Sequence, residues 1–431
     1  MGFVKGNIME TKEILKEGEV KHRSKLNGTT YSLITTHGCN EIVSIFVSTF
    51  LISYIYSISN NYLLNIGLFY MFSYIAMFIF YYLVSRIIDR TNRIVLYRVA
   101  IFIRAIFILM VVFLGKKLAG VVYLAGFLNG ISEGFYWCSF NLMKNELVPN
   151  HCIRQYSLTQ TIVGKVVGFV VPIILGKIID AESFKLTAII VLAIAVVEMT
   201  FSIFIKSRRP ENSGFDLKSF IKHAKSSEQN RALFKIVFLC SFCYGFLSMV
   251  APLNTMLVMI TFNSNFTLGL LTGIFSGLSI ILLFIIKKFA VNSRNKWYYL
   301  FAAFMPITSG IVLAFFTNEI VLIIFNFIFY LAQVVHTYFY DVYRNTLLKK
   351  LDLYGDIAEY QFMIEGLMEI ARIIGFGLMA FAGVIVGWIG MSSLVLVVKI
   401  FFVLSLLSFM LMNLGTWAME RKFVKYDMIV K

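Results

Sequence analysis

Twelve long apolar stretches, separated by short polar loops, run along almost the whole chain. A helix needs roughly 20 apolar residues to cross a bilayer core about 30 Å thick. Helices are expected because the backbone polar groups of a crossing segment must find partners within that segment. The pattern therefore predicts an all-α polytopic membrane protein with twelve transmembrane helices, at residues 33–57, 62–84, 95–114, 119–143, 157–178, 185–205, 233–260, 266–286, 297–316, 319–343, 361–386 and 391–415.

Lysine and arginine are distributed very unevenly between the two sides that these spans define. With the N-terminus in the cytoplasm, thirty of the 39 lie on the cytoplasmic side, and only Lys116, Lys117, Lys177 and Lys185 lie on the other. The positive-inside rule then places both termini in the cytoplasm, as in a multi-pass cell-membrane protein of the bacterial inner-membrane type. Basic loops facing anionic lipid explain the net charge of +16, so nucleic acid is not an expected partner.

One polar segment, residues 206–232, is longer than the other loops and divides the helices into two groups of six. Within it Phe215, Leu217, Phe220 and Ile221 alternate with lysines, which is typical of a short amphipathic helix on a membrane surface. The predicted organisation is a cytoplasmic N-terminal segment 1–32, a six-helix bundle 33–205, a cytoplasmic linker 206–232, a second six-helix bundle 233–415 and a cytoplasmic tail 416–431.

The chain carries no signature of an enzyme or of a cofactor site. It has no G-x-x-x-x-G-K loop, no G-x-G-x-x-G unit and no zinc-ligand spacing among its five cysteines. Cys39, Cys138, Cys240 and Cys243 fall in apolar stretches and are expected to be small core residues without disulfides. We therefore expect no catalysis, no cofactor and no metal, and a gradient as the energy source for any transport.

Six helices, a basic linker and six more helices resemble the major facilitator superfamily over nearly the whole chain. The loop after the second helix is similar to the G-x-L-x-D-R-x-G-R motif of that superfamily. Asp89, Arg90 and Arg93 match, whereas Ser85 and Asn92 replace the two glycines. Asparagine tolerates the left-handed turn conformation that a glycine would adopt there.

The resemblance implies twelve helices in two pseudo-symmetric bundles. It also implies that Asp89, Arg90 and Arg93 form a gating loop, a cytoplasmic charge cluster that stabilises one closed state. The alternative for this loop is a solvated basic turn. The segment 359–375 further resembles poorly characterised permeases of Gram-positive bacteria in the same superfamily.

The fifth predicted helix has a face of small residues. Gly164, Gly168, Pro172 and Gly176 recur every four residues, which allows another helix backbone to approach closely. This face resembles the Gly/Pro-rich fifth helix of proton-coupled exporters, but it lacks their adjacent Gly-Pro pair. Close helix packing explains it equally well.

Ionisable side chains occur within several predicted helices, where each is costly unless it faces protein or water. In the superfamily, helices 1, 4, 7 and 10 surround a central cavity, and polar residues of this chain fall on those helices. Glu41 has only His37 as a basic neighbour on its own helix, so it is the first candidate for carrying a proton. The candidate substrate and proton site is His37, Glu41, Asn129, Glu133, Tyr136, Trp137, Lys165, Gln333, His336, Tyr340, Glu365, Glu369 and Arg372.

Several of these charges are expected to pair with one another. Glu133 and Lys165, on adjacent helices, are interpreted either as a buried salt bridge or as substrate contacts. Glu369 and Arg372, three residues apart, can neutralise each other. Arg104 and Glu198 fall on outer supporting helices and are interpreted first as structural partners. His37 and His336 are interpreted as hydrogen-bonded core histidines in preference to proton relays.

The leading functional hypothesis is a monomeric secondary transporter that works by alternating access and exports an amphiphilic organic compound in exchange for protons. Its expected partners are a small-molecule or lipid-like substrate, protons and membrane lipids. Three alternatives remain: uptake of a sugar or other nutrient, flipping of a lipid or lipid-linked glycan, and a membrane sensor or peptide-immunity protein without transport. One fold hosts many cargoes, so the sequence does not identify the substrate.

Overall fold

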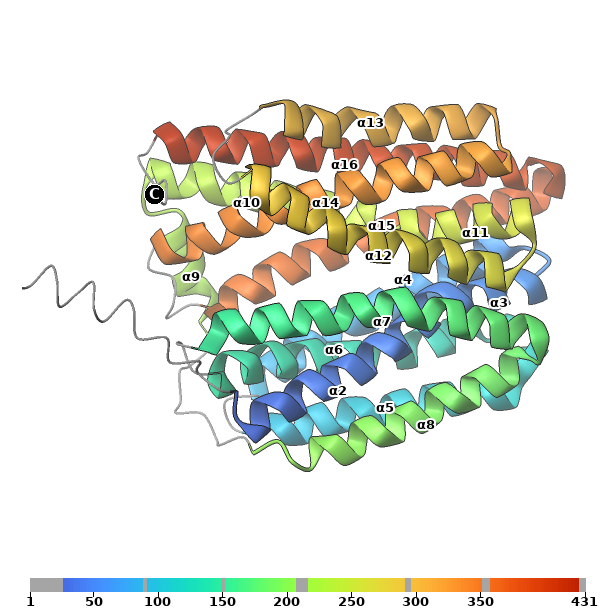
Figure 1. Cartoon of the computed structure of the whole chain (residues 1–431), viewed down its shortest axis with the longest axis horizontal. Coiled ribbons are helices and arrows are strands. Elements are labelled where there is room, and N and C mark those ends of the chain that lie inside the picture. Colours follow the sequence, from blue (N-terminus) through green and yellow to red (C-terminus); the bar gives the residue numbers. More distant parts are fainter. Residues whose placement is uncertain are drawn as a thin grey trace, which may run out of the picture.

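Two bundles of six long helices lie side by side in the structure, a computed structural model (Figure 1). Eleven helical segments in the described part are long and apolar enough to cross a membrane. A twelfth membrane-length helix, α6, is less apolar because it carries residues such as Asn129, Glu133 and Lys144. The structure describes residues 26–87, 91–148, 152–206, 216–290, 296–350 and 357–425, and within these ranges it is helical without strands.

The predicted twelve-helix architecture is confirmed, with helix ends that extend beyond the apolar stretches. The first bundle comprises α2 (Gly28–Ile45), η1 (Phe46–Leu51) and α3 (Ile52–Ile58) as one span, then α4 (Tyr62–Ile87), α5 (Arg93–Leu114), η2 (Gly115–Gly120), α6 (Val122–Leu147), α7 (Ile153–Ala181) and α8 (Phe184–Ser202). The second comprises α10 (Glu228–Leu247) and α11 (Val250–Phe262) as one span, then α12 (Asn265–Ala290), α13 (Lys296–Phe315), α14 (Glu319–Lys350), α15 (Ile357–Ile389), η5 (Met391–Ser393) and α16 (Leu394–Lys425).

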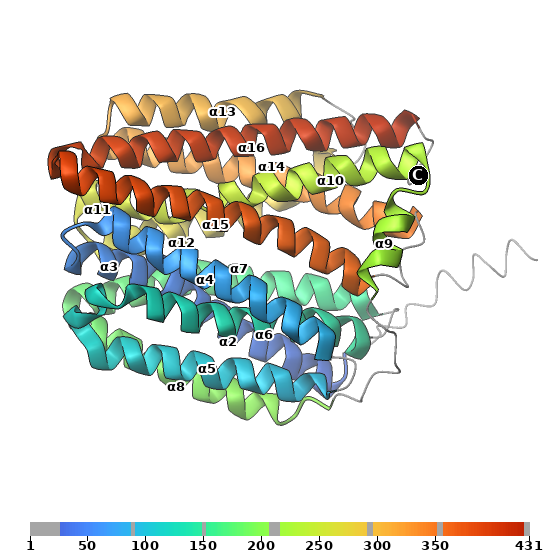
Figure 2. The ribbon, with the colours of Figure 1, turned by 180° about the vertical axis from the view of Figure 1, so that it is seen from behind.

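The molecule has two distinct ends. The beginning of α2, the linker helix α9 (Leu217–Ala224) and the end of α16 lie together at one end, called here the linker end (Figures 1 and 2). The opposite end, called the far end, holds α3, η2 and the turn from α11 to α12. If the termini are cytoplasmic, the far end faces the outside.

Two helix pairs make the most extensive contacts between the bundles: α4 packs on α15, and α7 packs on α12 (Figure 2). η1 and α3 also contact α11. Glycines allow the second pair to approach closely. A Cβ atom on Gly269 would lie 2.1 Å from the carbonyl oxygen of Pro172, and one on Gly176 would lie 2.4 Å from that of Asn265. The small-residue face predicted for the fifth helix thus packs on α12, except at Gly164, where a Cβ would meet nothing within 4 Å.

The first and seventh spans are both interrupted partway along. Phe46–Leu51 is a π-helical segment, and Ser248 and Met249 form a turn between α10 and α11. Pro252 follows in the next turn and has no N–H to bond the carbonyl four residues earlier. Interrupted helices at corresponding positions of two repeats are typical of transporter binding sites.

The described part of the linker forms the predicted short helix, α9. The Asp216 side chain caps its first turn, and Phe220 is fully buried, in ring contact with Phe234 and Tyr360. The Asp216 backbone N–H also donates to Glu359 Oε1 at 2.8 Å. These contacts attach the linker to α10 and α15 of the second bundle, while residues 207–215 lie outside the described residues.

Candidate functional site

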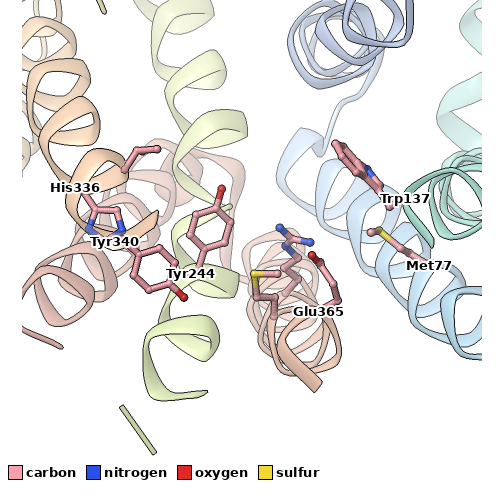
Figure 3. Close-up of a pocket in the computed structure, with 9 residues that line it drawn as sticks. Met77, Trp137, Tyr244, His336, Tyr340 and Glu365 are labelled. Carbon is pink, nitrogen blue, oxygen red and sulfur yellow. The ribbon is translucent and has the colours of Figure 1, made fainter. Parts of the chain in front are cut away.

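A cavity of about 340 Å³ lies between the two bundles. Figure 3 shows Trp137 and Met77 on one side, facing Tyr244, His336 and Tyr340 on the other. The first bundle contributes one residue each from α4 and α6, and the second contributes the rest from α10, α14 and α15. The lining residues are Met77, Trp137, Tyr244, His336, Thr337, Tyr340, Glu365, Met368 and Arg372.

Arg372 is the cationic side chain of this wall, and its charge is matched within the protein. Its guanidinium forms an ion pair with Glu369, as the spacing of three residues predicted. Glu369 is 1% exposed. The guanidinium also lies 5.0 Å from the ring centre of Tyr74 on α4, in the other bundle, and 6.0 Å from that of Tyr244. Arg372 therefore ties the two bundles together beside the cavity.

His336 is a hydrogen-bonded core histidine, as interpreted, although it also lines the cavity. Its Nδ1 lies 3.0 Å from Asn413 Oδ1, and its ring stacks on Tyr340 with the ring centres 5.3 Å apart. Its Nε2 is buried and has no hydrogen-bond partner among the described residues. The ring is thus held through one nitrogen, and the other nitrogen is buried without a described partner.

Behind Trp137 a buried charge network runs through the first bundle. The indole Nε1 donates to Glu133 Oε2 at 2.8 Å, and Glu133 Oε1 lies 3.5 Å from Arg104 Nη2. Arg104 Nη1 lies 3.3 Å from Glu198 Oε2, and Tyr97 donates its hydroxyl to the other oxygen of Glu198 at 3.0 Å. Arg104 is 1% exposed and Glu198 0%, so this ion pair is shielded from water, whereas the Glu133 side chain is 19% exposed.

His37 connects this network to Glu41. Its Nδ1 lies 2.8 Å from the Tyr136 hydroxyl, and its Nε2 lies 3.4 Å from Glu41 Oε1. The ring of Tyr136 in turn lies 4.9 Å from the Arg104 guanidinium carbon. Phe140 stacks on His37 with ring centres 4.6 Å apart. Glu41, at 32% side-chain exposure, is the more accessible end of this chain of contacts.

The predicted pair of Glu133 and Lys165 is wrong. Glu133 pairs with Arg104 and Trp137 instead, because α5 turns its guanidinium inward between α6 and α8. Lys165 lies within electrostatic reach of Glu41. The prediction treated α6 and α7 as packed neighbours because they are consecutive in the chain. In the structure α6 packs mainly on α4 and α5, whereas α7 packs mainly on α12 and α2.

The predicted site residues divide into three groups. Trp137, His336, Tyr340, Glu365 and Arg372 line the cavity, and Glu369 stands directly behind it. His37, Glu41, Glu133 and Tyr136 belong to the charge network of the first bundle, and Lys165 lies within electrostatic reach of Glu41. Asn129 instead donates to Ser73 at 2.9 Å between α6 and α4, and neither it nor Gln333, which is exposed on α14, lines this cavity.

Four cavity residues were not in the predicted site: Met77, Tyr244, Thr337 and Met368. Tyr244 lies on the seventh span, one turn before the break at Ser248, so helical spacing from that break would have indicated it. The two methionines resemble ordinary apolar residues of membrane helices, and no sequence signal distinguishes them.

A polar latch joins the bundles at the far end. Asp180 Oδ1 accepts from the backbone N–H and side-chain amide of Asn265, at 3.2 and 2.9 Å. Asp180 Oδ2 accepts from Ser264 Oγ and the Phe266 N–H, at 2.9 and 2.8 Å. A carboxylate from the end of α7 thus caps the N-terminus of α12, where it also opposes the positive end of the helix dipole.

The predicted gating loop is described only in part, because Asp89 and Arg90 lie outside the described residues. Arg93 Nη1 pairs with Glu146 Oε2 at 3.0 Å, which links the start of α5 to the end of α6. The left-handed turn expected at Asn92 is wrong. Its φ is −66°, and its side chain caps α5 by accepting from the Ile94 N–H at 3.2 Å.

Comparisons with known proteins agree with this architecture. A sequence model of the Major Facilitator Superfamily matches residues 32–347. The uncharacterized protein YqgE of Bacillus subtilis (strain 168) is 24% identical over 154 residues, and this match spans 35% of this chain and 35% of the relative.

Solved structures share the fold at low sequence identity. The nucleoside transporter NupG has a TM-score of 0.65 at 13% identity, covering 91% of this chain and 100% of that one. A bacterial homologue of the iron transporter ferroportin, in an inward-facing state, has a TM-score of 0.61 at 13% identity, covering 90% and 98%. A POT family transporter in complex with 5-aminolevulinic acid has a TM-score of 0.62 at 10% identity, covering 88% and 94%.

Proposed function

Because the chain belongs to the Major Facilitator Superfamily, we propose that it is a secondary transporter that exports an amphiphilic organic compound in exchange for protons. It works by alternating access in the cell membrane, with both termini in the cytoplasm. The cavity between the bundles is its substrate site.

The observation that carries this proposal is the position of Trp137 between the cavity and the buried charges. One side of the indole lines the cavity, and its N–H holds Glu133 Oε2. Glu133 shares Arg104 with Glu198. A substrate that displaces Trp137 therefore changes the surroundings of a carboxylate at membrane depth, and such a change alters how readily a carboxylate takes up a proton.

Glu41 supplies the accessible proton carrier of the same network. It contacts His37, which contacts Tyr136, whose ring lies over Arg104. Protonation of Glu41 removes a negative charge beside Lys165 and His37 and so shifts the electrostatics of the whole group. Proton binding and substrate binding thus act on one connected set of side chains, which is what obligatory exchange requires.

The contacts between the bundles support alternating access. The latch at Asp180 and the hydrogen bond from Asn61 Nδ2 to the Gly383 carbonyl oxygen, 2.7 Å long, hold the far end closed. Opening that end requires breaking these polar contacts. The packed helix pairs α4–α15 and α7–α12 then move past each other by small sliding motions. Differences in substrate and proton affinity between the two states drive this step.

The test is flux in liposomes that contain the purified protein and carry an imposed pH gradient, screened against dyes, sugars and fluorescent lipids. We expect dye movement opposite to the proton flow, which stops when a protonophore collapses the gradient. Three other results would contradict proton-coupled export. Sugar accumulation would favour uptake, lipid scrambling would favour flipping, and ligand binding without any flux would favour sensing.

A further inference from the structure

Lys165 is a cation at membrane depth whose charge is not paired within the described part of the chain. It lies on α7, is half-buried, and forms no ion pair or hydrogen bond with a described residue. A charge at this depth is costly unless it faces a counter-charge or water. The helix of the second bundle that packs on α7 is α12, and its sequence has no charged residue before Lys287. A carboxylate that balances Lys165 must therefore come from the first bundle.

The packing of α2 on α7 brings Glu41 to the level of Lys165. A Cβ atom on Gly38 would lie 3.0 Å from Val163 Cγ1, so the two helices approach closely at this point. Both helices begin at the linker end and run toward the far end (Figure 1). Glu41 follows shortly after Gly38, and Lys165 shortly after Val163, so both lie within about one turn of this contact. Lys165 accordingly lies within electrostatic reach of Glu41.

Glu41 is the carboxylate of this region whose charge is least balanced. The charged or titratable groups that face it are His37 on its own helix, Glu133 on α6, Arg104 on α5 and Lys165 on α7. Arg104 is already held between Glu133 and Glu198, the carboxylate that α8 contributes. A histidine is neutral over much of the physiological pH range, whereas a lysine beside a carboxylate keeps its charge. Lys165 is therefore the cation best suited to balance an ionised Glu41.

Resting on the proposed function, we propose that Lys165 forms an ion pair with Glu41 whenever Glu41 has released its proton. The ammonium group and the proton then compete for one carboxylate. In the structure the two groups stand apart, and the flexible four-carbon stem of Lys165 allows its ammonium group to reach Glu41. The pair avoids an unbalanced charge at membrane depth after the proton leaves. Lys165 is thus a positioning residue that sets the pH at which Glu41 takes up and releases its proton.

Infrared titration of the purified protein in detergent tests this competition. A protonated carboxyl group has its own C=O band, and the part of this band that is lost in Glu41→Gln reports the proton on Glu41. In Lys165→Met we expect the midpoint of this part to rise by at least about one pH unit, because a nearby positive charge favours the ionised carboxylate. An unchanged or lower midpoint would overturn the proposal. A band without a Glu41-dependent part in both proteins would overturn it as well.

Two further variants separate the charge of Lys165 from its shape. Lys165→Arg keeps the positive charge, so its midpoint should stay close to that of the unmodified protein. Lys177→Met removes an exposed lysine farther along the same helix and should leave the midpoint where it is. A shift in either variant as large as that in Lys165→Met would refute the pairing, because shape or total charge would then explain it. If Lys165→Met does not fold, Lys165→Gln is also neutral and gives the same comparison.

These measurements separate the inference from the proposed function, because the infrared titration requires no transport. A raised midpoint in Lys165→Met without any flux in liposomes would leave the inference standing and contradict transport. Proton-driven flux in the unmodified protein, with the same Glu41 midpoint in Lys165→Met, would support transport and refute the inference. A lower thermal midpoint of Lys165→Met without a shift of the titration would assign Lys165 to packing alone and would also refute it.

Discussion

At the scale of single residues, Arg104 organises the interior of the first bundle. It comes from α5, and its charge is shared by Glu133 on α6 and Glu198 on α8, while Tyr136 covers its face. Two carboxylates around one buried guanidinium form a network that stabilises the bundle only while it is complete, because an unpaired buried charge is costly. The interpretation of Arg104 and Glu198 as structural partners is thus confirmed, with Glu133 as an additional member.

Replacing the central cation should destabilise the protein strongly. Arg104→Met leaves the buried Glu198 carboxylate without a counter-charge, and we expect a loss of about 3–5 kcal/mol, measured as a lower thermal midpoint in detergent. The double variant Arg104→Met with Glu198→Met should recover most of the midpoint, because it removes the stranded carboxylate. Glu133→Gln should have little effect on the midpoint, since Arg104 keeps Glu198 and the amide oxygen still accepts from Trp137. An equal loss in Glu133→Gln and Arg104→Met would contradict this network.

Glu41 is the residue whose substitution should separate binding from energy coupling. Glu41→Gln keeps the shape of the side chain but cannot exchange a proton, so we expect gradient-driven flux at the level of protein-free liposomes while ligand affinity persists. Glu182→Gln, an exposed carboxylate at the end of α7, is the matched control. Flux is measured with and without an imposed pH gradient. Proton-driven flux of normal size in Glu41→Gln would exclude this carboxylate as the carrier.

At the scale of elements, the close contact between α6 and α4 depends on glycines spaced four residues apart. A Cβ on Gly126 would lie 2.1 Å from the Phe69 carbonyl oxygen, and one on Gly130 would lie 1.9 Å from that of Ser73. These distances are far too short for real atoms, so a side chain at either position must push the helices apart. The glycines of α6 therefore set how closely α4, the hinge helix beside α15, is held.

A single added methyl group tests this contact. Gly130→Ala should lower the thermal midpoint by the equivalent of about 1–3 kcal/mol, because the Ser73 backbone cannot yield as a flexible side chain would. Gly164→Ala on α7 is the matched control, since a Cβ there meets nothing within 4 Å. It should be neutral, or slightly stabilising through better helix propensity. Similar midpoints for the two variants would show that the α4–α6 spacing is not set by Gly130.

At the scale of the whole molecule, the latch at Asp180 sets the balance between states with the far end closed and open. Each carboxylate oxygen accepts two hydrogen bonds from the start of α12. Asp180→Asn replaces one oxygen by a donor and removes the negative charge at a helix N-terminus. We expect the closed population to fall.

Distances between spin labels across the far end measure this shift. Labels at exposed Lys116 of the first bundle and exposed Glu319 of the second should gain a longer-distance population in Asp180→Asn. Lys185→Gln, an exposed change at the same end, should leave the distribution as in the parent. An unchanged distribution in Asp180→Asn would show that apolar packing alone holds the far end closed.

The sequence by itself determined the helices and their grouping. Hydropathy and segment length are local properties, so the spans, the break at 206–232 and the helical character of residues 217–224 could be predicted without knowing any neighbour. The ion pair of Glu369 and Arg372 was also within reach, because it joins residues three positions apart on one helix. The capping role of Asn92 was missed because asparagine is favoured both at the N-cap of a helix and in a left-handed turn.

Only the tertiary structure decided which side chains from different helices meet. The order of helices along the chain does not fix which of them pack together, so Glu133 on α6 could be assigned to Lys165 on α7 when its partner is Arg104 on α5. Met77 lines the cavity, but in the sequence it is one apolar residue among many. The latch at Asp180 joins residues more than 80 positions apart, and no local pattern predicts such a contact. The cavity, the buried charges and the latch at the far end are all formed by contacts between helices that are distant in the sequence. They arise from tertiary packing.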